Sequence, residues 1–161
     1  MNKSTIEMRY PFSFSTQYNQ FYLLFDKTTD NGRHTNQGYE DKLDISAGEV
    51  AVYTQSYGQI KGELVLLEHP NDEIDFGKYD HIVEGGMDVK SGTIDIIDCP
   101  FSHVALSIQL TPQRYRIRVY SSGFASVLVS DDYEEYQDYY KIEIWPDENW
   151  ERKVLKRYIE T

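Results

Sequence analysis

Basic residues are scarce in this sequence relative to acidic ones. Lys and Arg together number 16 and Asp and Glu together number 27, so the formal net charge at pH 7 is −11. A field of that sign repels phosphate backbones and anionic lipid head groups. The composition therefore disfavours direct binding to DNA, RNA or a membrane surface. It favours a basic protein partner, because opposite net charges raise the rate of encounter.

Cysteine and long apolar runs are also nearly missing. Cys99 is the only cysteine among the 161 residues, so no internal disulfide can form. No apolar run approaches the roughly 20 residues that span a bilayer, and the first residues, MNKSTIEMRYPF, lack the apolar core of a signal peptide. We expect a cytoplasmic protein in which Cys99 is a buried structural residue and not a catalytic thiol.

Recognisable catalytic and metal-binding motifs are absent from the sequence. There is no GxSxG elbow, no phosphate-binding Walker loop and no GxGxxG fingerprint. The four histidines lie far apart, without the short spacings typical of zinc sites: His34, His69, His81 and His103. We therefore expect no catalytic residues, no metal site and no cofactor.

Apolar residues recur mostly at every second position, and 3.6-residue periodicity is almost absent. Alternation of this kind indicates strands that bury one face. Short strands separated by frequent turn signals predict an all-β fold, a two-sheet antiparallel β-sandwich, built as a single domain over residues 1–161.

Short polar connections divide the chain into expected loops and hairpins. Residues 28–39 are rich in Thr, Asn, Asp and Gly, and residues 69–80 carry Pro70, Gly77 and several acids, so both stretches predict surface loops. Hairpins are expected where a short connection joins two apolar runs, in residues 50–54 with 60–68 and in residues 81–89 with 92–97.

The later strands differ in what they place on each face. Val104, Leu106 and Ile108 alternate with small or polar residues, which predicts a cleanly buried face. Arg114, Arg116 and Arg118 alternate with apolar residues. We expect these arginines on an outward face, paired with carboxylates of neighbouring strands such as Glu143.

The C-terminal third is expected to hold one more strand and a helix. Residues 140–144 predict a strand that ends at Trp145 and Pro146, because proline lacks the N–H that a ladder requires. Residues 150–158 predict a short C-terminal helix, with a further strand as the alternative.

Acidic residues are concentrated in two regions. Residues 59–100 hold three basic and ten acidic residues, and these include Asp72, Glu73 and Asp75. The second region, DDYEEYQDYY, interleaves carboxylates with tyrosines. Such a stretch resembles a nucleic-acid mimic, because carboxylates pair with phosphate-binding Arg and Lys while tyrosine supplies rigid contact area.

These two regions supply the candidate partner-binding residues. An ordinary solvated surface, and an acidic loop whose tyrosines pack at sheet edges, remain the alternatives. The candidates are Asp72, Glu73, Asp75, Asp131, Asp132, Tyr133, Glu134, Glu135, Tyr136 and Asp138.

Three stretches of the sequence resemble one known family. Tyr18-Asn19-Gln20-Phe21 resembles a Tyr-x-Gln-Phe run in the first strands of that family, residues 48–67 match the spacing of its central hairpin, and residues 101–119 resemble its apolar strand, Pro-containing turn and Tyr-led strand. The family that these stretches resemble is competence protein J. The likeness covers residues 10–120, and Pro112-Gln113-Arg114 departs from the family's Pro-x-Gly turn. It implies a nonenzymatic bacterial protein that inhibits a DNA-entry nuclease.

Three functional hypotheses follow. The first is an inhibitor or immunity protein that binds a basic bacterial nuclease or toxin and blocks its substrate groove. The second is a carbohydrate- or small-ligand-binding module, with exposed tyrosines and Trp145 or Trp150 as a stacking platform. The third, an enzyme using a carboxylate pair, lacks a convergent His, Cys or Ser constellation. The oligomeric state is not predicted by any of these features.

Overall fold

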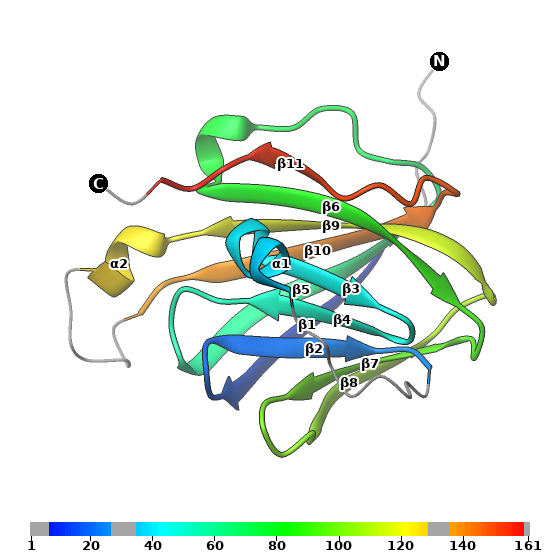
Figure 1. The fold of residues 1–161 in the computed structure, drawn as a ribbon, viewed down its shortest axis with the longest axis horizontal. Helices are drawn as coiled ribbons and strands as arrows, with labels where there is room; N and C mark the ends of the chain where they lie inside the picture. Colours follow the sequence, from blue (N-terminus) through cyan, green and yellow to red (C-terminus); the bar gives the residue numbers. More distant parts are fainter. Residues whose placement is uncertain (1–6, 27–34, 129–135, 160–161) are drawn as a thin grey trace.

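Two facing sheets form the protein, which confirms the all-β sandwich (Figure 1). A computed structural model describes residues 7–26, 35–128 and 136–159. Sheet A is six-stranded, in the order β1 (Glu7–Thr16), β5 (Gly58–Leu67), β10 (Tyr139–Pro146), β9 (Gln113–Ser122), β6 (His81–Val89) and β11 (Lys153–Lys156). Sheet B is five-stranded, in the order β3 (Leu43–Ser46), β4 (Glu49–Tyr53), β2 (Gln20–Leu24), β7 (Thr93–Asp98) and β8 (Val104–Gln109).

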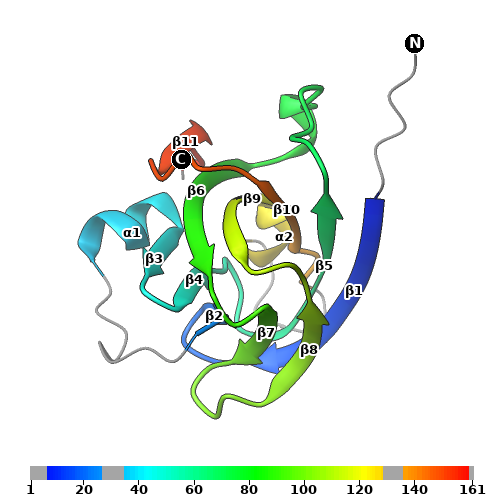
Figure 2. The same ribbon diagram turned by 90° about the vertical axis from the view of Figure 1, so that its right-hand side faces the viewer.

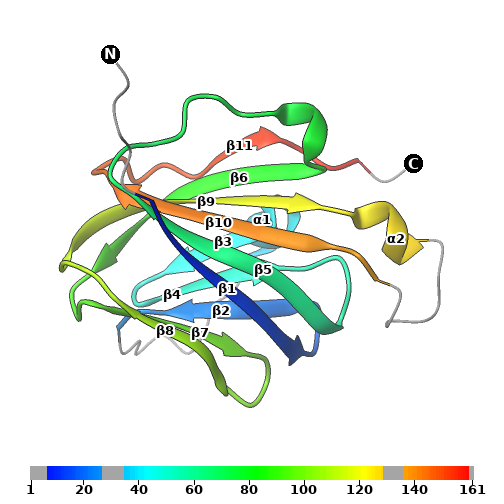
Figure 3. The same ribbon diagram turned by 180° about the vertical axis from the view of Figure 1, so that it is seen from behind.

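Neighbouring strands are antiparallel except at the centre of sheet A. There β10 runs parallel to β5, with Ile142 opposite Leu64, and antiparallel to β9, with Ile142 opposite Val119. Seen from behind, sheet A lies in front, and its edge strand β1 runs diagonally beside β5 (Figure 3). Gly62 of β5 permits the close approach of β10, since a Cβ at this position would lie 1.9 Å from the Tyr140 carbonyl oxygen.

The core lies between the sheets, which curve around it (Figure 2). Phe21 and Leu23 of β2 meet Ile60 and Leu64 of β5 and Ile142 of β10, all fully buried. Full burial of one such side chain is worth about 1.5–3 kcal/mol. Alternate residues of these strands therefore hold one sheet against the other.

The two hairpins expected from the sequence are not hairpins. β4 belongs to sheet B and β5 to sheet A, while β6 belongs to sheet A and β7 to sheet B. Each short connection carries the chain across the sandwich, as does the link from β8 to β9. A polar, Gly-containing connection is compatible with either a hairpin or a crossing, and the burial of both apolar faces decides between them.

Helices are few and short in the described part of the chain: α1 (Asn36–Asp41), the 3-10 turn η1 (Phe76–Lys78) and α2 (Phe124–Leu128). Helix α1 replaces the end of the loop expected over residues 28–39, because the Thr35 hydroxyl accepts a hydrogen bond from the Gly38 N–H and caps the helix. Residues 69–80 form the expected loop, interrupted only by η1. None of the described helices has the length and hydrophobicity to cross a membrane.

The C-terminal segment is a strand and not the expected helix. β11 pairs antiparallel with β6, with Val154 opposite Val83. The chain reaches that position by passing over Gly86, where a Cβ would lie 2.8 Å from the Trp150 Cα. Pairing with the edge of β6 supplies backbone hydrogen bonds that an isolated helix of this length does not outweigh.

The face of β8 expected to be cleanly buried is only partly covered. Ile108 is buried, Leu106 is half-buried and Val104 is 58% exposed. β8 pairs only with β7 and forms the edge of sheet B. Alternation correctly predicted the strand, but the edge position leaves its first residue outside the core.

Candidate functional site

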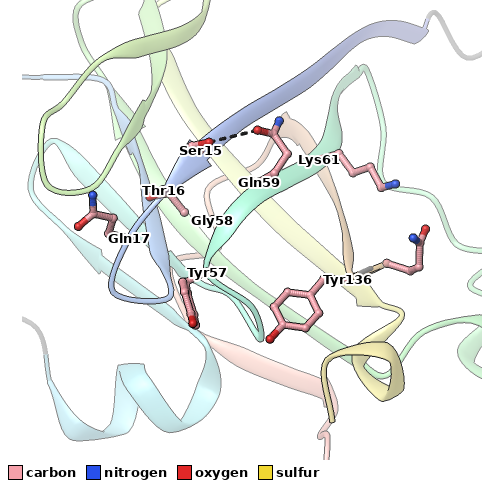
Figure 4. Close-up of a pocket in the computed structure, with 9 residues that line it drawn as sticks. Ser15, Thr16, Gln17, Tyr57, Gly58, Gln59, Lys61 and Tyr136 are labelled. Atoms are coloured by element: carbon pink, nitrogen blue, oxygen red, sulfur yellow. Dashed lines mark hydrogen bonds between the residues drawn. The ribbon is translucent and has the colours of Figure 1, made fainter. Parts of the chain in front are cut away.

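A cavity lies where β1, the β4–β5 connection and the segment before β10 meet. It has a volume of about 630 Å³. Figure 4 shows Tyr57 and Tyr136 at one end of this cavity and the hydrogen-bonded Ser15 and Gln59 at the other. We call it the tyrosine pocket, and its described lining residues are Ser15, Thr16, Gln17, Tyr57, Gly58, Gln59, Lys61, Tyr136 and Gln137.

Neutral hydrogen-bonding groups and aromatic rings dominate the tyrosine pocket. Tyr57 is 54% exposed, and Lys61 is the one charged residue among the described lining residues. Gln59 is held in place because its amide nitrogen donates to the Ser13 hydroxyl at 2.6 Å. Rigid aromatic walls with a few oriented polar groups are suited to holding a partner side chain or a small polar ligand.

A buried carboxylate holds the two tyrosine-bearing segments together. The Ser56 hydroxyl donates to Asp138 Oδ2 at 2.6 Å, the Ser56 N–H donates to the same oxygen at 3.2 Å, and the Tyr140 hydroxyl donates to it at 2.6 Å. The Gln55 N–H donates in turn to the Tyr140 hydroxyl oxygen at 2.7 Å. This Asp138 clamp joins the β4–β5 connection, which bears Tyr57, to the segment that bears Tyr136.

Asp138 is therefore not a surface carboxylate for a partner. Only 2% of the residue is exposed, and its oxygens are taken by donors of the chain itself. Burial and the neighbouring Asp138 charge raise the pKa of Tyr140, so this hydroxyl stays protonated as a donor. The pattern DDYEEYQDYY could not reveal this, because all its carboxylates look alike in sequence.

Of the other nine candidate partner-binding residues, the structure describes four. Asp72, Glu73 and Asp75 are exposed on the loop between β5 and β6, away from the tyrosine pocket and not among its described lining residues. Tyr136 is half-buried and lines the tyrosine pocket. Five candidates lie outside the described residues: Asp131, Asp132, Tyr133, Glu134 and Glu135.

Arg116 and Arg118 of β9 lie on the outer face of sheet A and pair with carboxylates, as expected, but they are buried there. Arg116 is 2% exposed and Arg118 6% exposed, and only Arg114 is an exposed residue. Arg116 Nε contacts Glu84 at 2.9 Å, and Arg118 contacts Glu84 at 2.7 Å and Glu143 at 3.8 Å. The 69–80 loop covers this face, because Arg118 also donates to the Asn71 carbonyl oxygen at 2.8 Å.

Burial also sets the ionisation of the tyrosine beside these arginines. The Tyr120 hydroxyl donates to Glu143 and accepts from Arg118 Nη1. Burial, and then the Glu143 carboxylate, raise the pKa of Tyr120 well above its ordinary range. The result is a closed network of charges that is committed to holding the sheet and its covering loop.

His81 and Cys99 occupy buried structural positions. His81 is 1% exposed, with Nε2 at 2.7 Å from the Asp41 carbonyl oxygen and Nδ1 accepting from the Tyr158 N–H at 3.0 Å. Cys99 is buried, as expected, with its sulfur 3.5 Å from the Tyr22 hydroxyl. Among the described residues no group of His, Cys, Asp and Glu is arranged to hold a metal ion.

Of the two tryptophans named for a stacking platform, only Trp150 is exposed. Trp145 is 1% exposed on the outer face of sheet A beside Val65 and Leu67, whereas Trp150 is 55% exposed. Exposed aromatic side chains near the tyrosine pocket are instead Tyr57 and, on the β1–β2 connection, Tyr18.

Charge is divided unequally between the sheets, and sequence reasoning missed this division. The strands of sheet A contain eight Lys or Arg and five Asp or Glu. The strands of sheet B contain no Lys or Arg and four acids, Asp44, Glu49, Asp95 and Asp98. Counting by sequence segment hides the difference, because consecutive strands alternate between sheets.

Comparisons with known proteins identify the fold and not a family. No family model matches the chain, and no curated protein matches its sequence. Among solved structures, the chain is similar to ComJ from Bacillus subtilis, described as an inhibitor of the DNA-degrading activity of NucA. The TM-score is 0.64 at 19% identity, over 88% of this chain and 99% of ComJ.

A second solved structure shares the fold. The protein described as crocagin biosynthetic gene J is similar with a TM-score of 0.56 at 16% identity, over 90% of this chain and 99% of that one. At these identities the likeness demonstrates a common fold, and it confirms the distant resemblance to competence protein J noted from the sequence.

Proposed function

We propose that this chain is a nonenzymatic inhibitor or immunity protein of the bacterial cytoplasm, which binds a basic nuclease or toxin domain and blocks its substrate groove. The observation that carries the proposal is the separation of charge. Five of the six described arginines pair with carboxylates of the chain itself, namely Arg9, Arg116, Arg118, Arg152 and Arg157. The strands of sheet B, by contrast, contain four acids and no Lys or Arg; of these acids, Asp44 and Asp98 are buried, and Asp44 lies 3.9 Å from Arg152.

Pairing of this kind leaves few arginines to offset the remaining surface acids. The described exposed acids include Glu68, Asp72, Glu73 and Asp75, in a chain whose net charge is −11. A surface of that sign competes with polynucleotide for a cationic cleft. The fold shared with ComJ supports an inhibitor role, since ComJ is described as inhibiting a DNA-degrading nuclease.

In this mechanism the acidic stretch of residues 131–135, which precedes Tyr136 in the sequence, makes the charged contacts. Asp131, Asp132, Glu134 and Glu135 would pair with phosphate-binding Arg or Lys of the partner, with a contribution from Asp72, Glu73 and Asp75. Tyr133 and Tyr136 would supply the apolar anchors. Asp138 takes no part in these contacts, because it is buried.

The test is to neutralise the four carboxylates Asp131, Asp132, Glu134 and Glu135 together as Asn or Gln. Loss of several charge pairs predicts inhibition weakened about a hundredfold or more. The readout is degradation of fluorescent duplex DNA by NucA, the nuclease that ComJ is described as inhibiting.

A matched control separates local contact from overall charge. Glu40, Glu68, Glu148 and Glu151 are exposed, and replacing them by Gln removes the same four charges elsewhere. We expect this variant to keep its inhibition within about threefold. Equal effects of the two quadruple variants would remove the acidic stretch from the binding surface.

A small polar ligand, such as a carbohydrate, is the second candidate, and the tyrosine pocket favours it. Two tyrosines, the Gln17 and Gln59 amides and a volume of about 630 Å³ match the ordinary size and chemistry of ligand sites. A glycan array read with the wild-type chain and with Tyr57→Ala tests this function. Saccharide binding that depends on Tyr57 would establish it.

A further inference from the structure

The β8 edge of sheet B differs from the other three edges of the described sheets, which are β1, β11 and β3. Edge strands of natural proteins usually carry Lys, other charged residues or Pro, which prevent another strand from pairing with them. β1 has Arg9 and Pro11, β11 has Lys153 and Lys156, and β3 has Asp44. β8, with the sequence VALSIQ, has neither a charged residue nor proline.

A helix covers the edge of β3, whereas β8 is approached by β1, which lines a cavity together with Val104 and Ala105 at the start of β8. Helix α1 packs on β3, and Arg152 Nη1 donates to the Leu43 carbonyl oxygen at 3.4 Å. β8 has one irregularity, since Ile96 pairs with Leu106 but Ile97 with Val104, so that Ala105 is an extra residue. This bulge lies at one end and leaves residues 106–109 as a regular strand.

The backbone groups at this edge are identified by the ladder with β7. The Leu110 N–H donates to the Gly92 carbonyl oxygen at 3.0 Å, just past the pair Gln109 and Thr93. Antiparallel ladders alternate, so Leu106 and Ile108 direct their backbone groups to β7 while Ser107 and Gln109 direct theirs outward. In the described part of the chain no residue outside the ladder bonds to these outward groups.

An added strand would also gain apolar contacts. Val104 is 58% exposed, and a cavity of about 230 Å³ between β1 and β8 is lined by Phe14, Val104 and Ala105. A side chain from a neighbouring strand would fill this space and cover Val104. Backbone pairing would supply affinity and the apolar position would set the register, as in other cases of strand addition.

Charge selects the kind of strand. Asp95 is half-buried beside the edge and accepts from the Ser107 hydroxyl at 2.5 Å, and the strands of sheet B contain no Lys or Arg. A second copy of this chain carries a net charge of −11 and the same acidic sheet, so self-pairing is opposed by repulsion. A segment bearing Lys or Arg is attracted.

We infer that β8 binds an extended, Lys- or Arg-containing segment of a protein partner, which becomes a sixth strand of sheet B. This inference rests on the proposed function for the identity of the partner, but the site itself does not depend on that function. This contact lies on sheet B, whereas the β1 and β5 walls of the tyrosine pocket belong to sheet A.

Amide hydrogen exchange provides the direct test. In the free protein the Ser107 and Gln109 amides should exchange rapidly and the Ile108 amide slowly. Addition of the inhibited nuclease should slow exchange at Ser107 and Gln109 at least about tenfold. If the nuclease is inhibited while both amides exchange as before, the inference is overturned and the proposed function stands.

A peptide probe tests the edge without the nuclease. A capped peptide alternating Lys and Val, at millimolar concentration, should slow exchange at the same two amides about threefold or more, and a Glu–Val peptide should not. Protection by Lys–Val without inhibition of any nuclease would support the strand site and count against the proposed function. Protection that grows with protein concentration alone would overturn the inference in favour of a second copy.

A pair of variants at one position supplies the control. Gln109→Pro removes an outward N–H that β7 does not use, so the fold should tolerate it, whereas Gln109→Ala retains the N–H. We expect the proline variant to lose at least about half of the Lys–Val protection at Ser107 and the alanine variant to keep it. Equal protection in both would contradict strand addition.

Discussion

At the scale of single residues, burial decides what a carboxylate can do. Asp138 and Asp75 both come from acidic stretches, yet Asp138 is 2% exposed and bonded to Ser56 and Tyr140, while Asp75 is exposed. The first can only position other groups, and the second can meet a partner. Glu84 and Glu143 are likewise committed to Arg116 and Arg118.

Replacing Asp138 by Ala should destabilise the fold strongly. The Ser56 hydroxyl and N–H and the Tyr140 hydroxyl would lose their acceptor, and buried unsatisfied donors cost about 1–3 kcal/mol each. We expect the free energy of unfolding to fall by about 2–4 kcal/mol in urea titrations. Asp75→Ala is the control and should change it by no more than about 0.5 kcal/mol. Indistinguishable urea midpoints would exclude the clamp.

At the scale of elements, one histidine joins three separate parts of the chain. His81 begins β6, its Nε2 meets the carbonyl oxygen at the end of α1, and its Nδ1 accepts from Tyr158, just beyond β11. The ring is therefore neutral, with its proton on Nε2. Burial, and next the Lys42 and Arg157 charges, lower the pKa of His81 to about 4, although the bond to Asp41 opposes them.

This histidine makes stability depend on pH in a defined direction. The unfolded chain binds a proton near pH 6.5 and the folded chain only near pH 4, so acid favours the unfolded state. The contribution is complete above pH 6.5 and is lost as the pH falls to about 4. At about 1.4 kcal/mol for each pKa unit, the loss approaches about 3 kcal/mol.

The measurement is the free energy of unfolding at several pH values for the wild type and for His81→Gln. The difference between the two proteins should shrink between pH 6.5 and 4, because Gln does not titrate. Acidic groups far from His81 affect both proteins equally and cancel. Parallel curves over this interval would show that folding does not lower the pKa of His81.

At the scale of the whole molecule, net charge governs encounter with a partner. Sheet A carries the bases and sheet B only acids among its described strands, so the field is uneven around the molecule. A basic nuclease would be steered toward the acidic side before any contact forms.

The association rate constant with such a nuclease should fall steeply with salt. Between about 50 and 500 mM NaCl we expect a decrease of about tenfold or more, because the Debye length shortens from about 14 to 4 Å. Stopped-flow fluorescence measures this rate, and the dissociation rate serves as the internal reference, since it should change much less. A rate independent of salt would rule out electrostatic steering.

The sequence alone determined the strand content, the net charge and the absence of known catalytic motifs, because each depends on composition or on local alternation. It also placed Arg118 next to Glu143 correctly. Which strands share a sheet depends on how both apolar faces are buried at once, and this decision is tertiary. For that reason only the structure turned the two expected hairpins into crossings and residues 153–156 into β11. The same packing buried Asp138 and left sheet B with acids alone.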